Sequence, residues 1–94
     1  MGEDENITVF LKALGHPTRL SMVRELLEGE RCVSEVENRL HISQVNASQH
    51  LSVLKASGIV DCTRRGNSRC YYLKDPDFMR SLFVLLGKNK TWKG

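Results

Sequence analysis

The sequence lacks the main features of a membrane, secreted or disulfide-stabilised protein. None of its apolar runs approaches the roughly 20 residues that a membrane-spanning helix needs. Its first residues include the acidic Glu3, Asp4 and Glu5, whereas a secretory signal peptide begins with basic residues. Three cysteines are too few for a disulfide framework, so we expect them to be packing residues or sensory thiols. These absences predict a cytoplasmic protein.

The residue combinations of an enzyme are also missing. The histidines His16, His41 and His50 are scattered along the chain, and each is expected at a helix cap or on the surface. No nucleophile–base pair, metal-ligand cluster or phosphate-binding loop accompanies them. The sequence therefore predicts a protein that is not an enzyme and that holds neither a cofactor nor a metal ion.

Acidic residues are scarce in the second half of the chain. Eight of the eleven Asp and Glu residues precede residue 38, and only Asp61 lies between residues 38 and 73. Five basic residues occupy that range: Arg39, Lys55, Arg64, Arg65 and Arg69. This local excess of positive charge is typical of a surface that faces phosphates, although the three arginines alone also fit a solvated basic hairpin.

The sequence does contain a regular order of helix, turn and hairpin signals. Amphipathic spacing and cap signals predict helices over about residues 5–14, from Pro17 to a stop at Gly29, and over about 33–40 and 43–57. Asp75 and Pro76 mark the start of a last helix over about 76–87. Strands over about 59–65 and 68–73 flank Gly66 and Asn67, which form a strong hairpin signal. This order predicts a single domain over residues 1–94, mainly α with a β-hairpin wing at about 59–73. The fold class is a winged helix-turn-helix.

The helix predicted over residues 43–57 has two chemically different faces. Ala47, Leu51 and Leu54 recur at helical spacing and must face a core. The opposite face gathers uncharged side chains, most of them able to form hydrogen bonds: Val45, Ser48, Gln49 and Ser52. A merely solvated face would carry Lys and Glu, whereas this face suits the donors, acceptors and thymine methyls of a DNA major groove.

The last predicted helix is apolar on all sides. Residues 82–86 read LFVLL without interruption, and so small a domain cannot cover such a helix by itself. The first helix is also short and apolar on one face. We therefore expect a homodimer that forms through the helices at about 5–14 and 76–87.

Three segments together resemble the ArsR–SmtB family of small dimeric bacterial repressors. They read LKALGHPTRLSMVRELL, SQVNASQHLSVLKASGIV and RRGNSRCYYL, and the resemblance covers about residues 7 to 87. It implies a homodimer that binds double-stranded operator DNA of imperfect two-fold symmetry and is released by an inducer.

The resemblance also implies which residues contact DNA. It assigns base reading to Ser43, Gln44, Asn46, Ser48, Gln49 and His50. The helical projection agrees for Ser48 and Gln49 and adds Val45, and Gln49 is the strongest candidate because a glutamine can bond adenine through both amide groups. Ser43 fits a plain N-cap better than a base contact. His50 lies at the boundary between the two faces, where it fits a phosphate or intrahelix hydrogen bond as well as base reading. Phosphate or minor-groove contacts are expected from the wing residues Arg64, Arg65, Asn67 and Arg69.

The sensor residues depart from the family pattern. The family's thiolate site reads Cys-Val-Cys, but this chain has Cys32-Val33-Ser34, so a site for a soft metal ion is incomplete. The family's zinc site on the last helix needs histidine, which this helix lacks. Cys32, Cys62 and Cys70 thus remain candidate thiols for a thiol-reactive or thiophilic metalloid inducer, or they simply fill packing positions.

The register of the hairpin decides what Cys62 and Cys70 can do. A two-residue turn at Gly66-Asn67 places Cys62 opposite Tyr71, and the two thiols then lie on opposite faces. A three-residue loop places Cys62 opposite Cys70, where a disulfide is conceivable. An approach of Cys32 to the wing is not expected. The alternative to a repressor is a winged-helix protein-interaction module without specific DNA binding.

Overall fold

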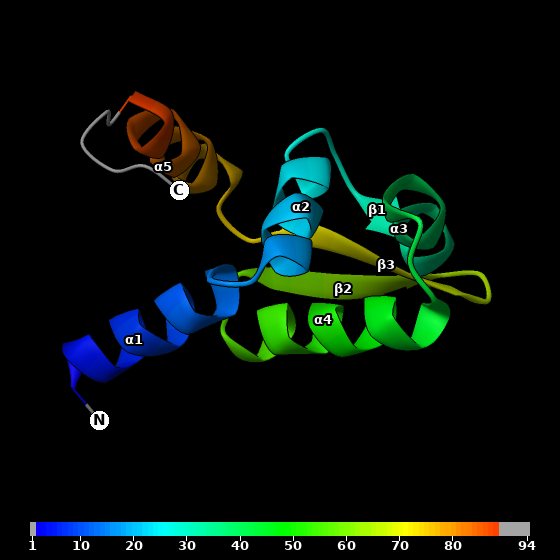
Figure 1. Cartoon of the computed structure of the whole chain (residues 1–94). Helices are drawn as coiled ribbons and strands as arrows, with labels where there is room; N and C mark the ends of the chain where they lie inside the picture. Colours follow the sequence, from blue (N-terminus) through cyan, green and yellow to red (C-terminus); the bar gives the residue numbers. More distant parts are fainter. Residues whose placement is uncertain (1, 89–94) are drawn as a thin grey trace.

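The computed structural model describes residues 2–88, which form five helices and a three-stranded antiparallel sheet (Figure 1). The elements follow in the order α1 (Glu3–Leu14), α2 (Pro17–Leu26), β1 (Arg31–Cys32), α3 (Val33–Leu40), α4 (Gln44–Ala56), β2 (Val60–Arg65), β3 (Ser68–Leu73) and α5 (Pro76–Lys88). This arrangement confirms the predicted winged helix-turn-helix fold. The short strand β1 was not predicted.

Local signals fix both ends of α4, the second helix of the helix-turn-helix. The backbone N–H of Asn46 donates to Ser43 Oγ over 3.1 Å, so Ser43 caps α4 as expected from the sequence. After α4, Gly58 has a φ of 82°, a left-handed conformation that a side chain would disfavour. These two signals set the length of α4.

The sheet has the strand order β1-β3-β2. Arg65 pairs with Ser68 and Cys62 pairs with Tyr71, so the hairpin closes on the two-residue turn at Gly66-Asn67. The three-residue loop considered above is wrong, and with it the direct pairing of Cys62 with Cys70. Instead β1 pairs with β3 on the other side, and Cys32 lies opposite Cys70.

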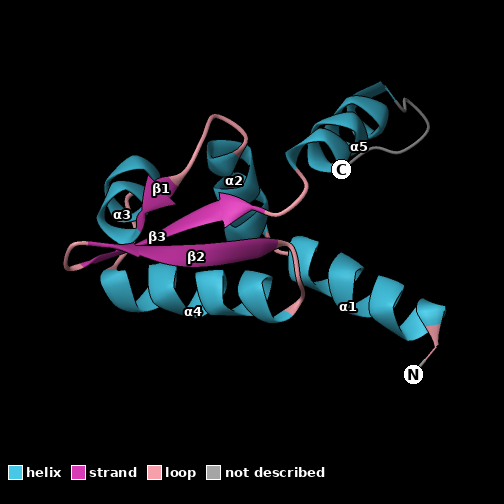
Figure 2. Cartoon of the chain, turned by 180° about the vertical axis from the view of Figure 1, so that it is seen from behind, coloured by secondary structure: helices cyan, strands magenta, loops and turns pink. Residues whose placement is uncertain are grey.

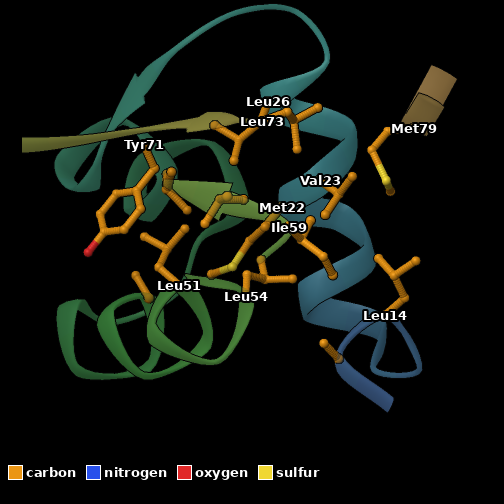
Figure 3. Close-up of a cluster of buried hydrophobic side chains, with 14 residues drawn as sticks. Leu14, Met22, Val23, Leu26, Leu51, Leu54, Ile59, Tyr71, Leu73 and Met79 are labelled. Atoms are coloured by element: carbon orange, nitrogen blue, oxygen red, sulfur yellow. The ribbon is translucent and has the colours of Figure 1, made fainter. Parts of the chain in front are cut away.

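One apolar core packs α4 against α2 and the hairpin. Met22 and Val23 of α2, together with Leu51 and Leu54 of α4, have no exposed surface (Figure 3). Tyr71 contributes from β3 and is 5% exposed. Because the stripe of α4 at Leu51 and Leu54 is fixed in this core, the opposite face of α4 must point outward.

Helices α1 and α5 lie at one end of the molecule, and the tip of the hairpin lies at the other (Figure 1, Figure 2). They meet where the rings of Phe10 and Phe78 pack edge to face, with 5.9 Å between ring centroids. Met79 is the one described residue of α5 that is buried. Several large apolar side chains of these two helices are exposed: Ile7, Val9, Leu11, Phe78, Val84, Leu85 and Leu86. Over residues 2–88, no helix has the length and hydropathy to span a bilayer.

Candidate nucleic-acid interface

The outward face of α4 presents the side chains that the sequence placed there. Ser48, Gln49 and Ser52 are exposed, and Val45 is 65% exposed. The first turn adds two further exposed amides, Gln44 and Asn46. From Gln44 to Ser52 this face carries no formal charge, and it offers amide and hydroxyl groups that can both donate and accept hydrogen bonds.

Two of the predicted base-reading residues have other contacts. The Ser43 hydroxyl already accepts the N–H of Asn46 as the cap of α4. His50 is half-buried and turns toward α2, where its Nδ1 lies 3.2 Å from the Arg19 guanidinium and its ring lies 4.5 Å from the ring of His16. Burial lowers the pKa of His50, and the neighbouring His16 and Arg19 lower it further. The structure therefore separates His50 from the exposed face of Gln49 and Ser48.

The three wing arginines divide between the two faces of the hairpin. Arg64 and Arg69 are paired directly across β2 and β3, on the same face as the buried Tyr71 and hence toward α4. Like charges in such a pair repel each other. Within residues 2–88, neither of these two arginines forms an ion pair. An anion bound between these two exposed cations would relieve their repulsion.

Arg65 points to the other face of the hairpin and is already paired. Its guanidinium binds the carboxylate of Glu30 through two contacts, Nε to Oε2 and Nη2 to Oε1. The hydrogen bond to Glu30 raises the pKa of Arg65, and the same bond lowers the pKa of Glu30. Sequence reasoning missed Glu30 because its partner lies 35 residues along the chain.

A groove of about 400 Å³ runs between the helix-turn-helix and the wing. It brings together predicted contact residues from α4 and from the hairpin with residues of α3 that were not predicted. Its lining consists of Val33, Ser34, Glu37, Gln44, Ser48, Ser52, Asn67, Ser68, Arg69 and Tyr71. The groove thus connects the uncharged face of α4 to the positive wing.

The cysteines are arranged differently from the expectation. Cys32 and Cys70 form a disulfide across 38 residues, whereas Cys62 is free and half-buried. The expectation that Cys32 stays away from the wing is wrong, because β1 carries it to the neighbouring position on β3. Among residues 2–88, no three side chains of His, Cys, Asp or Glu are placed to hold a metal ion together.

Comparison with known proteins identifies similar regulators. Residues 16–61 match the family described as "Bacterial regulatory protein, arsR family". The chain is 45% identical over 65 residues to the "HTH-type transcriptional repressor SmtB" of Mycobacterium tuberculosis, which covers 69% of this chain and 48% of that protein. It is 44% identical over 79 residues to the "Biofilm growth-associated repressor" of Agrobacterium fabrum, covering 84% and 68%.

Solved structures of similar fold are also known. The homodimeric winged helix-turn-helix DNA-binding domain Mb0332 of Mycobacterium bovis, a fragment of residues 1–100, superposes with a TM-score of 0.80 and 26% identity. The match covers 88% of this chain and 79% of that one. The chain spans about half the length of the first curated relatives it matches, which have 48% of their residues in the alignment.

Proposed function

The chain belongs to the ArsR family of bacterial regulatory proteins, and we propose that it is a homodimeric transcriptional repressor that binds a specific DNA operator. The observation that carries the proposal is the exposed, uncharged face of α4 beside the cations Arg64 and Arg69, which form no ion pair with any residue from 2 to 88. Bases are read by groups that donate and accept hydrogen bonds, and phosphates are held by cations. Both kinds of group lie on the same side of the molecule, along one groove.

Base reading is assigned to α4. Gln49 and Ser48 lie at the centre of its exposed face, with Val45 placed to contact a thymine methyl. Gln44, Asn46 and Ser52 extend this surface along the helix. An α-helix fits the width of the major groove, so the whole face can approach base edges while Leu51 and Leu54 stay in the core.

Phosphate binding is assigned to the wing. A phosphate between Arg64 and Arg69 would relieve the repulsion between the two guanidinium groups, and Asn67 at the tip supplies a further donor. Arg65 contributes less because Glu30 already neutralises it. Ser43 is proposed to act as a helix cap, and His50 to position α4 through its contact with Arg19.

Dimerisation is assigned to α1 and α5. Their exposed apolar side chains, such as Leu11, Val84 and Leu85, would be removed from water by a second copy. The similar Mb0332 domain is described as homodimeric. A two-fold dimer would present two copies of α4 to successive major grooves, roughly 34 Å apart. We place the protein in the cytoplasm, where such a regulator meets DNA.

The experiment that tests this function selects duplexes from a random 30-base-pair library and measures their affinity against a scrambled duplex. The selected sequence should show two-fold symmetry and bind much more tightly than the scrambled one. Gln49→Ala should abolish most of that preference, whereas Lys74→Ala, an exposed change outside the groove, should not alter it. Equal affinity for both duplexes would contradict specific repression.

A second candidate is a protein-interaction module that uses the exposed apolar side chains of α5. In that case another protein, and not a second copy, would cover Val84 and Leu85. Sedimentation of the purified chain distinguishes the two, because a stable self-dimer supports the repressor. A monomer that binds no selected duplex supports the module.

A further inference from the structure

The Cys32–Cys70 disulfide joins the helix-turn-helix to the wing. We propose that it is a reversible thiol–disulfide exchange site through which low-molecular-weight thiols and their disulfides control DNA affinity. This inference rests on the DNA-binding function proposed above. The two cysteines are paired directly across β1 and β3 and are 38 residues apart in the chain.

The disulfide connects the two walls of the groove. Cys32 immediately precedes α3, and its neighbour Val33 lines the groove on the α3 side. Cys70 lies on β3 between Arg69 and Tyr71, which both line the groove on the wing side. The bond therefore fixes the position of Arg69 relative to the helix-turn-helix.

Few other contacts hold the outer half of the wing against the helices. The hairpin is anchored in the core by Val60 and Leu73 at its base and by Tyr71, the neighbour of Cys70. Beside Tyr71 and Cys70, β1 contributes a ladder of only two residue pairs, Arg31 with Tyr71 and Cys32 with Cys70. The remaining tie is the exposed ion pair of Arg65 with Glu30, and exposed pairs stabilise little. Without the disulfide, only this short ladder and the ion pair hold Arg69 and the tip of the hairpin against the helix-turn-helix.

The two sulfur atoms differ in their access to solvent, which sets the order of the exchange steps. Cys70 is completely buried, whereas Cys32 is partly exposed. A thiolate RS⁻ attacks Cys32 Sγ, the protein S–S bond breaks, and Cys70 leaves as a thiolate. A second thiol then attacks the R sulfur of the mixed disulfide, which releases RSSR and the Cys32 thiolate. The sum is one protein disulfide plus two RSH giving two protein thiols plus RSSR, a two-electron reduction of the protein.

The oxidised form is the form with high DNA affinity. Its wing is held in place before binding, so less conformational freedom is lost when DNA binds. Reduction frees the outer half of the hairpin, and we expect the affinity for the selected duplex to fall roughly tenfold. Cys62 has no part in this exchange, because it lies opposite Tyr71 on the other face of the hairpin.

The exchange chemistry is tested first on the full chain by alkylation and mass spectrometry in glutathione buffers. After oxidation and denaturation, the chain should take up one alkyl group, at Cys62, and after reduction it should take up three. Folded Cys70→Ser should form a glutathione adduct at Cys32 rapidly, and folded Cys32→Ser should react slowly at the buried Cys70. Uptake of three groups after oxidation would overturn the proposal.

The regulatory role is tested by the affinity for the selected duplex in glutathione disulfide and in reduced glutathione. Wild type and Cys62→Ser should both bind roughly tenfold more tightly when oxidised, whereas Cys32→Ser and the double variant of Cys32 and Cys70 should bind at the reduced level in both buffers. Equal, tight binding by both states of the wild type would overturn only the redox control. A chain that prefers no duplex in either state would overturn the proposed repressor and its control together, while the alkylation result would still identify the exchange site.

Discussion

Two exposed surfaces of this molecule differ in their chemistry. From Gln44 to Ser52, the outward face of α4 consists of amides and hydroxyls, with Val45 as its large apolar member. The α1–α5 end exposes large side chains such as Phe78 and Leu85. Amides and hydroxyls can replace hydrogen bonds to water by hydrogen bonds to base edges with little change in free energy. Burial of exposed apolar side chains, in contrast, lowers the free energy. The first surface therefore suits a partner that binds reversibly, and the second suits a stable interface.

The largest expected effect comes from charging the apolar end. Leu85, which is 66% exposed, should tolerate Leu85→Asp in the monomer fold, but the charge would be buried in a dimer interface. We expect loss of the dimer and a fall in affinity for the selected duplex of roughly a hundredfold or more, because each half-site must then bind alone. Analytical ultracentrifugation and fluorescence anisotropy measure the two changes.

Lys74→Asp is the matched control for this experiment. It adds the same acidic side chain at an exposed position between β3 and α5, outside the apolar cluster. The control should remain dimeric. If Leu85→Asp also remained dimeric with full affinity, the assignment of the apolar end to self-association would be wrong.

The polar surface of α4 is tested by Gln49→Ala. A bidentate pair of hydrogen bonds to one base supplies about 1–3 kcal/mol of discrimination per half-site, and alanine cannot form it. The affinity for the selected duplex should fall accordingly, while the affinity for the scrambled duplex and the thermal stability should stay the same because Gln49 is exposed and outside the core. Competition binding with both duplexes measures this, and an equal decrease on both would assign Gln49 to the DNA backbone.

A smaller effect separates the arginines of the wing. Arg64→Ala and Arg69→Ala should each lower the slope of log affinity against log salt by about one unit for each phosphate that the variant no longer binds. Arg65→Ala should change the slope less, because Glu30 already binds this guanidinium. Glu30→Ala should instead strengthen binding, since it releases Arg65. Equal slopes for all three arginine variants would contradict the division of the wing into two faces.

Local sequence patterns predicted much of this architecture. The spacing of Ala47, Leu51 and Leu54 identified the core face of α4, and so its exposed face, because a regular helix fixes both. The Gly66-Asn67 turn predicted the hairpin. The apolar run of α5 predicted a helix that is too exposed for a monomer. Each of these inferences depends on residues close together in the chain.

What the sequence did not reveal depends on distant segments. A strand of two residues has no periodicity, so β1 could not be predicted, nor could the Cys32–Cys70 bond that depends on it. The pairing of Glu30 with Arg65 was hidden for the same reason. The contacts of His50 were also missed. His50 lies at the boundary between the two faces of α4, and it is half-buried because Arg19 and His16 pack against it.

The smallest expected effect concerns His50, which links α4 to α2 through Arg19 and His16. Its pKa is lowered in the folded state, first by burial, while the unfolded chain keeps the ordinary value near 6.5. The unfolded state therefore binds a proton first as the pH falls through about 6.5, and folding loses stability until the folded histidine is protonated too. Stability should be fully present above that pH, and urea unfolding between pH 8 and 5 should show the decrease.

His50→Gln should remove this part of the pH dependence, because glutamine does not titrate in the range. The Glu30–Arg65 pair does not contribute to the change between pH 8 and 5. The pKa of Glu30 is lowered below 4.5, so its contribution to the free energy of unfolding is lost only at lower pH. If the variant kept the full dependence between pH 8 and 5, the burial of His50 against Arg19 would not be its cause. Because His50 contacts α2 and not the exposed face of α4, the ratio of selected to scrambled affinity should remain that of wild type at pH 8.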